Sequence, residues 1–325
     1  MKKVIIPLFC LLFIGLTLYF LDPITNKIVE KIEDEKPLVV LNGNTYTKDK
    51  SYKYVALTEE YIPYSYQDLL NIYYSAINSG WDQFTFYCPS EYTNCLSDTE
   101  KISGDELILT HLNNYVHPFN SFTNIKTSMK ETGEITIYIY YLYTKEEIDK
   151  INTKVDSLMK SLMNKDFEDD YEKIKVVHDY IVNNTKYDVE RNEGTSQKYN
   201  SYTAYGPLFD GLATCNGYTD LMAIFLSKMG YDNYKIATTP NEISYSSTGH
   251  IWNAVKIYDK KENIWKWLHI DLTWDDPVSN DGKDYLFHKY FLVSTSEMQE
   301  ADKGETVIEE HNFNKMFYLE FNERS

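Results

Sequence analysis

Residues 206–230 read GPLFDGLATCNGYTDLMAIFLSKMG, and their single cysteine, Cys215, lies where a loop ends and a helical pattern begins. Unpaired N–H groups at the start of a helix favour a negative charge, which makes a thiol there a better nucleophile. The same groups can stabilise an oxyanion that develops on a substrate carbonyl. Gly230 is a natural residue to end the helix. The apolar side chains at helical spacing are Tyr218, Leu221, Met222, Phe225, Leu226 and Met229.

Two alternating segments follow, His250–Tyr258 and Ile264–Thr273, and the polar run DKKEN between them predicts a β-hairpin. A turn centred between Lys260 and Lys261 would place His250 directly opposite Asp271, with Cβ atoms about 5 Å apart. A slip of one residue would put the two side chains on opposite faces. A nucleophilic cysteine needs a histidine base, and the histidine needs an orienting acid. Cys215, His250 and Asp271 are therefore the predicted catalytic residues.

Three blocks of the sequence resemble the bacterial transglutaminase-like superfamily, which has a papain-like fold: TCNGYTDLMAIFLSKMGY, GHIWNAVKI and WLHIDLTWDDP. The upstream segments VHDYIVNNTKYD and SYTAYGPL are also similar to the family, so the resemblance covers roughly residues 170–295. It implies that Cys215, His250 and Asp271 are the catalytic cysteine, histidine and aspartate. It also implies an α+β core in which a cysteine-bearing helix packs on an antiparallel sheet that carries the histidine and the aspartate.

Other assignments of these residues stay open. Cys215 could be an inert buried thiol, and His250 could be a core histidine. His269 is an alternative base, because it shares a face of its strand with Asp271. A polar side chain in 199–205 is expected to be the second oxyanion donor, with Tyr205 as the first candidate.

Several further polar and aromatic residues are expected to be structural. His178 is interpreted as a packed residue on a helix face rather than a ligand, since no partner motif accompanies it. Asp275 and Asp276 precede Pro277 and are expected to shape the turn. Four tryptophans are expected in the core or the walls of the site: Trp252, Trp265, Trp267 and Trp274.

The N-terminus predicts export. Lys2 and Lys3 precede an apolar run of 18 residues, Val4 to Leu21, which is the short end of what spans a bilayer. The run ends in bulky residues, which favours an uncleaved anchor over a cleaved signal peptide. We therefore expect a single-pass membrane protein with an extracellular domain, or a secreted protein if the signal is cleaved.

Export changes the interpretation of the four cysteines. Cys10 lies in the apolar run. Cys88 and Cys95 bracket a turn-like segment, CPSEYTNC, and predict a small-loop disulfide, with a metal site as the alternative. Cys215 is left over, either buried and inert or reactive.

The chain divides into five predicted parts. Residues 1–21 are the signal anchor, 22–50 a stalk, 51–165 a smaller α+β accessory domain, 166–300 the catalytic domain and 301–325 a C-terminal tail. Patterns in the accessory domain predict helices at 64–80 and 105–116, a strand at 134–144 and a capping box at Thr144 and Glu147 that opens a helix to about residue 164. A further helix is expected after Asp169 and Asp170.

The formal net charge of -17 argues against nucleic acid as a partner and against anionic lipid as a docking surface.

We expect a protein or peptide substrate outside the cytoplasm, whose amide is attacked to give a thioester. Water as acceptor gives a peptidase or amidase, and an amine gives a cross-linking enzyme. No metal or organic cofactor is required, and no EF-hand-like loop is present in the sequence. A non-catalytic surface module that binds protein or glycan is the alternative.

Overall fold

The computed structural model of the chain describes residues 52–57, 59–192, 194, 200–238, 249–278, 283–303 and 310–321. The predicted anchor at 1–21 and the predicted stalk at 22–50 lie outside these residues. Among the helices that are described, none is long and apolar enough to cross a membrane.

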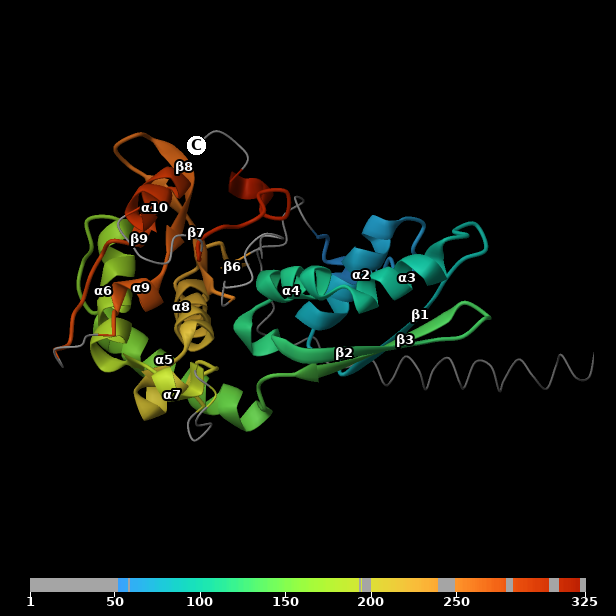
Figure 1. The fold of residues 1–325 in the computed structure, drawn as a ribbon, viewed down its shortest axis with the longest axis horizontal. Coiled ribbons are helices and arrows are strands. Elements are labelled where there is room, and N and C mark those ends of the chain that lie inside the picture. Colours follow the sequence, from blue (N-terminus) through green and yellow to red (C-terminus); the bar gives the residue numbers. More distant parts are fainter. Residues whose placement is uncertain are drawn as a thin grey trace, which may run out of the picture. The chain divides into compact units, whose positions relative to one another are not determined.

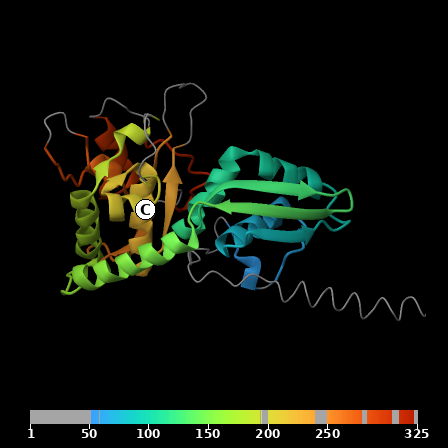
Figure 2. The same ribbon diagram turned by 90° about the horizontal axis from the view of Figure 1, so that it is seen from below.

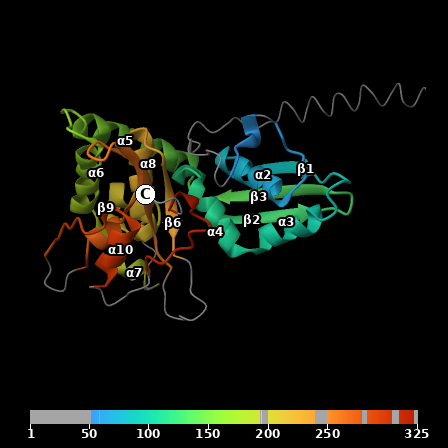
Figure 3. The same cartoon turned by 90° about the horizontal axis from the view of Figure 1, so that it is seen from above.

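The first part of the described chain is a three-stranded antiparallel sheet with helices packed against it. Strand β3 lies between β1 and β2 (Figure 3). Isoleucines 135, 137 and 139 of β3 are buried, and Figure 1 shows the three helices of this part on one side of the sheet. The elements are α2 (Tyr66–Asn78), β1 (Gln83–Tyr87), α3 (Cys95–Gly104), α4 (Glu106–Tyr115), β2 (Phe122–Met129) and β3 (Glu134–Tyr141).

The helices and the strand predicted for residues 64–164 are confirmed within a few residues. Ser65 caps α2 by accepting from the Asp68 N–H, and Asp105 caps α4 in the same way. Helix α5 (Lys145–Leu162) starts with the predicted capping box of Thr144 and Glu147. Figure 2 shows α5 as a long helix that leads from the three-stranded sheet toward α6 (Asp170–Asn184).

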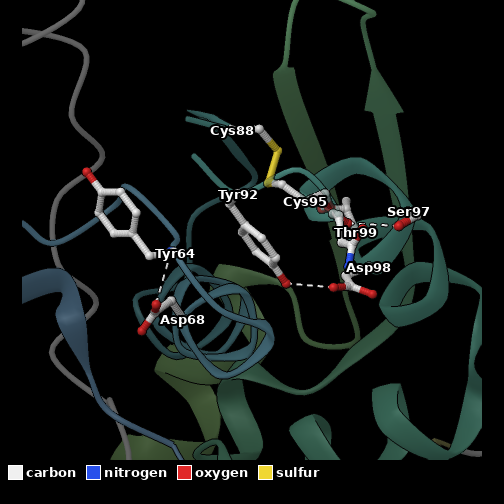
Figure 4. The surroundings of a disulfide bond; sticks show 9 residues. Tyr64, Asp68, Cys88, Tyr92, Cys95, Ser97, Asp98 and Thr99 are labelled. Atoms are coloured by element: carbon white, nitrogen blue, oxygen red, sulfur yellow. Dashed lines mark hydrogen bonds between the residues drawn. A yellow bond between two sulfur atoms is a disulfide. The ribbon is translucent and has the colours of Figure 1, made fainter. Parts of the chain in front are cut away.

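The predicted disulfide between Cys88 and Cys95 is present, with a Cα–Cα distance of 5.8 Å (Figure 4). It ties the end of β1 to the first residue of α3. Tyr92 lies in the closed loop, and its hydroxyl donates to the carboxylate of Asp98 in α3 at 2.7 Å. With both sulfurs in this bond, the alternative of a metal site at these cysteines is wrong.

The second part contains the helix and the antiparallel sheet that the fold prediction required. Helix α8 packs on β6 and β7 of a four-stranded antiparallel sheet of order β6-β7-β8-β9. Strands β4 and β5 form a separate two-residue parallel pair. The elements after α6 are β4 (Lys186–Tyr187), α7 (Val189–Asn192), a π-helical turn (Gly206–Asp210), β5 (Leu212–Ala213), α8 (Cys215–Lys228), β6 (Asn233–Ala237), β7 (Ile251–Asp259), β8 (Ile264–Ile270), α9 (Leu272–Asp275), β9 (Phe291–Val293) and α10 (Thr295–Asp302).

The buried hydrophobic residues of the described segments form two clusters. One surrounds α8 and takes in Val177 of α6, Val255 of β7 and Ile270 of β8. The other joins the three-stranded sheet and its helices to β6 and to the end of the chain, where Tyr318 is 3% exposed and stacks with Tyr234. Residues 310–321, predicted as part of a tail, thus contribute to the interior.

The predicted register of the hairpin is wrong by two residues. Ala254 pairs with His269, whereas the predicted turn would have paired it with Trp267. The turn is a four-residue loop, because Asp259 accepts from the N–H groups of residues 261 and 262 and Asn263 takes a left-handed φ of 59°. Since a shift of two residues preserves the face of a strand, His250 and Asp271 remain on the same side of the sheet.

Candidate active site

Cys215 is the first residue of α8, as predicted, and is partly exposed. The preceding Thr214 N–H donates to the Ser201 carbonyl at 2.9 Å. Glycine is required at position 217, because a Cβ there would lie 2.2 Å from the carbonyl oxygen of Ser201. The residue 200–204 loop therefore packs directly on the first turn of α8 and holds the thiol in place.

A buried network fixes the same helix from the other side. The Asp220 carboxylate accepts from Lys235 Nζ at 3.0 Å and from the Tyr143 hydroxyl at 2.7 Å. Lys235 also donates to Ser121 Oγ at 2.8 Å, and the Tyr143 hydroxyl accepts from the Ala204 N–H at 2.8 Å. Side chains that precede α5 thus position the cysteine-bearing helix and the loop against it.

His250 lies just before β7 and Asp271 just after β8, and the structure brings both to Cys215. The imidazole Nε2 of His250 lies 2.5 Å from Asp271 Oδ2, and Cys215 lies close enough to the same ring to interact with it electrostatically. Burial alone would lower the pKa of His250, but Asp271 and Cys215 outweigh it and raise that pKa well above its usual value. An imidazolium is therefore favoured beside the thiol.

The end of the second strand differs from the prediction, since Leu272 and Thr273 are helical rather than extended. Asp271 is the N-cap of α9, and its Oδ1 accepts from the N–H groups of Thr273 at 2.9 Å and Trp274 at 3.3 Å. These bonds fix the carboxylate so that Oδ2 points at His250.

Asp271 has a second imidazole partner, which sequence reasoning missed. His311 Nε2 lies 2.8 Å from Asp271 Oδ2, and its Nδ1 lies 2.8 Å from Asp302 Oδ1. Burial would raise the pKa of Asp271, but His250 and His311 hold it well below its usual range. Burial would likewise lower the pKa of His311, but Asp271 and Asp302 raise it. No motif around His311 signalled this contact; it arises from packing of the C-terminal segment.

Cys215 and His250 line a cavity of about 290 Å³. Its wall includes two carboxyl groups, and burial raises the pKa of one of them, Asp276, to about 7. The other, Glu310, accepts from Trp274 Nε1 at 3.0 Å. Larger hollows, about 530 Å³ beside β2 and about 900 Å³ along α5, have neither cysteine nor histidine among their described lining residues. The remaining residues of the wall are Tyr187, Gly249, Thr273, Trp274, Pro277 and Val278.

The alternative base, His269, and the expected oxyanion donor, Tyr205, are not in the wall of this cavity. Both ring nitrogens of His269 are engaged, by Trp252 Nε1 and Thr295 Oγ1 at 3.0 Å each, and burial lowers the pKa of His269 to about 3. The ring of Tyr205 lies tilted against that of Phe209, with centroids 4.5 Å apart, and Tyr205 is not part of the cavity wall. Two other tyrosines, Tyr187 and Tyr202, interact electrostatically with Cys215.

Asp275 and Asp276, which were expected to shape the turn before Pro277, bind partners from other helices. Asp276 accepts a hydrogen bond from the Tyr218 hydroxyl. Asp275 Oδ2 lies 3.2 Å from Nε2 of His178, which is fully buried on α6. His178 is thus packed on its helix face, as expected, and it has a carboxylate partner that sequence reasoning did not find.

A cysteine-bearing helix packed on an antiparallel sheet that carries a histidine and an aspartate defines an α+β core of the transglutaminase-like type. The sequence agrees: residues 159–272 match the model of the transglutaminase-like superfamily, so the chain carries a domain of this superfamily. No curated protein matches the chain.

Solved structures of similar proteins include the crystal structure of a TGase, with 17% identity and a TM-score of 0.32 over 50% of this chain and 48% of that one. Another is the periplasmic domain of TgpA from Pseudomonas aeruginosa, with 11% identity and a TM-score of 0.28 over 46% of this chain and 65% of that one. The chain thus spans less than two thirds of either protein.

Proposed function

We propose that the chain is a cysteine-dependent acyl-transfer enzyme that acts on protein or peptide amides. The observation that carries the proposal is that Cys215 and His250 line the same cavity and interact, while Asp271 binds Nε2 of the same imidazole. The match of residues 159–272 to the transglutaminase-like superfamily supports the same chemistry.

In the proposed reaction, His250 takes the proton of the Cys215 thiol, and the resulting thiolate attacks the amide carbonyl. The same proton passes from His250 to the leaving amine as the C–N bond breaks. The product of this half-reaction is a thioester on Cys215. His250 then takes a proton from water or from an acceptor amine, which attacks the thioester and frees the thiol. Asp271 keeps the imidazole oriented throughout.

Reactivity of the thiol tests the proposal without knowledge of the substrate. The full chain is treated with iodoacetamide at pH 7 and at pH 10, and alkylation of the Cys215 peptide is followed by mass spectrometry so that Cys10 does not interfere. We expect His250→Ala to slow alkylation at pH 7 by about tenfold or more and to have little effect at pH 10, where hydroxide replaces the base.

An alkylation rate at pH 7 that does not depend on His250 would contradict the enzyme and favour a non-catalytic binding module. If the rate does depend on it, release of peptides from a labelled protein and incorporation of a fluorescent primary amine distinguish hydrolysis from cross-linking.

We also propose that the catalytic domain lies outside the cytoplasm, held by the N-terminal segment. The basic start and apolar run of residues 2–21 and the Cys88–Cys95 disulfide support export, because structural disulfides persist in oxidising compartments. Protease treatment of intact cells is the test: the domain should be degraded without lysis, and protection would contradict export.

A further inference from the structure

A second cluster of two histidines and an aspartate lies on α6 and the segment before β9. We call His178, Asp179 and His288 the α6 cluster. His288 Nε2 lies 2.6 Å from Asp179 Oδ1, and His178 Nδ1 lies 3.1 Å from the same oxygen. The proposed reaction uses none of these residues, and none of them is in the wall of the Cys215 cavity.

The geometry of the α6 cluster suits a small metal ion. One ligand atom from each residue can be chosen so that all three lie within 4.8 Å of one another. Nitrogen and oxygen ligands placed about 2 Å from a tetrahedral zinc ion are on the order of 3.3 Å apart. Only small movements of these side chains are therefore needed to surround an ion.

The buried histidine is held as metal-binding histidines usually are. Its Nε2 faces Asp275 Oδ2 at 3.2 Å, and Asp275 Oδ1 accepts from the Tyr290 N–H at 3.0 Å. A carboxylate that accepts from one ring nitrogen fixes the tautomer and leaves the lone pair of the other nitrogen for a metal. In the α6 cluster that other nitrogen is His178 Nδ1, the atom that faces Asp179.

The cluster is apolar on one side and open on the other. Phe291 packs against the rings of His178 and His288, with centroid distances of 4.8 and 5.8 Å. His178 is buried, whereas the side chains of Asp179 and His288 are 26% and 31% exposed. An ion can therefore enter from solvent, and a water molecule can complete the coordination.

A lysine competes with a cation at this place. Lys175 Nζ lies 2.5 Å from Asp179 Oδ2, the oxygen that faces away from the histidines. Its ammonium repels a metal ion at close range, although it leaves Oδ1 accessible. Removal of this charge should strengthen metal binding, an effect opposite in sign to removal of a ligand.

We propose that His178, Asp179 and His288 bind a divalent transition-metal ion of the zinc type. Two imidazoles and one carboxylate suit zinc, cobalt or nickel, whereas calcium and magnesium prefer a shell made of oxygen. The ion would clamp α6 to the segment that carries His288 and, through Asp275, to α9, whose N-cap is Asp271. This inference does not depend on the proposed acyl-transfer reaction.

The test uses the full chain with Cys10 and Cys215 replaced by serine, so that neither thiol competes for metal. Zinc binding is measured by calorimetry, and cobalt binding by its visible absorption, which reports the number and geometry of the ligands. We expect one zinc ion per chain, a higher melting temperature with zinc, and about 100-fold weaker binding in His288→Ala, since each ligand of a small site contributes strongly.

Three further variants make the test specific. Asp179→Asn should weaken binding as His288→Ala does, and both change partly exposed side chains, so the fold should survive. Lys175→Met should tighten binding by about tenfold, because it removes one positive charge next to the ion. His311→Ala is the matched control: it removes a histidine from the Asp271 cluster and should leave zinc affinity unchanged.

Absence of zinc binding at 100-fold excess over protein would overturn the proposal. The proposal would also be overturned if zinc binding survived in His288→Ala or disappeared in His311→Ala, because either result would place the ion elsewhere.

Discussion

The residues that the structure describes include two clusters of the same composition, His250–Asp271–His311 at the Cys215 cavity and the α6 cluster of His178, Asp179 and His288. In each, two imidazoles share one carboxylate, and the potential ligand atoms lie within 4.8 Å of one another. Their surroundings differ: all three residues of the first are buried, whereas only His178 of the second is. The Cys215 thiol interacts with His250 of the first cluster, and the Lys175 ammonium binds Asp179 of the second. Two clusters with the same residue types therefore differ in their burial and in the fourth group beside them, a thiol in one and an ammonium in the other. We expect these two differences to decide which reaction or ligand each cluster supports.

Loss of turnover is the largest effect that the comparison predicts. Cys215→Ala and His250→Gln should each lower the rate of acyl transfer by at least about 10³-fold, because the nucleophile and its base act as one unit. The rate is measured with a labelled protein substrate and a fluorescent amine. Met316→Ala, at a side chain that is 75% exposed, is the control and should keep the parental rate. Substantial turnover in Cys215→Ala would refute the assignment of this cluster as catalytic.

The same substitution in both clusters should change stability by different amounts. Asp271→Asn leaves two buried imidazoles without their shared carboxylate and should lower the free energy of unfolding by about 3–5 kcal/mol. Asp179→Asn, measured in metal-free protein, should lower it by about 1 kcal/mol or less, because this carboxylate is partly exposed. Chemical denaturation provides both values. Equal losses would mean that burial does not distinguish the clusters.

We expect His311 to act as a positioning residue whose charge is visible in a pH profile of activity. It faces Asp271 and Asp302, and it interacts electrostatically with His250 and His269. His311→Gln can still donate a hydrogen bond to Asp271 but loses the positive charge that opposes protonation of His250. The pKa of His250 should therefore rise, and the alkaline limb of kcat/KM should move to higher pH. A lower rate with an unmoved limb would indicate a purely structural role.

The smallest expected effect is on the pH dependence of stability. The folded-state pKa of His311 is raised, so the native state keeps a proton that the unfolded state releases above about pH 6.5. Stability from this group is complete below that pH and is lost as the pH rises through the folded-state pKa. In His311→Gln, the free energy of unfolding should fall less steeply above pH 6.5, by up to about 1.4 kcal/mol per pH unit. Parallel curves for the two proteins, from denaturation at several pH values, would contradict a protonated His311.

Much of the site was predictable because its determinants are local or periodic. The 3.6-residue pattern after Cys215 indicated α8, and the alternation on both sides of residues 259–263 indicated β7 and β8. The register was missed because the Asp259 side chain and the left-handed Asn263 set the loop length. Alternation fixes only the face of a side chain, and that was sufficient to bring His250 and Asp271 together.

The sequence by itself determined the helix start at Cys215, the shared face of His250 and Asp271, and the disulfide, because neighbouring residues encode each of these. The class of the fold came from the resemblance of three sequence blocks to the transglutaminase-like superfamily. Only the tertiary structure decided that Asp271 is shared with His311, that Asp220 and Lys235 hold the cysteine-bearing helix, and that His178 meets His288 across 110 positions. Contacts between distant segments depend on how whole elements pack, and no periodicity within a segment records its partner.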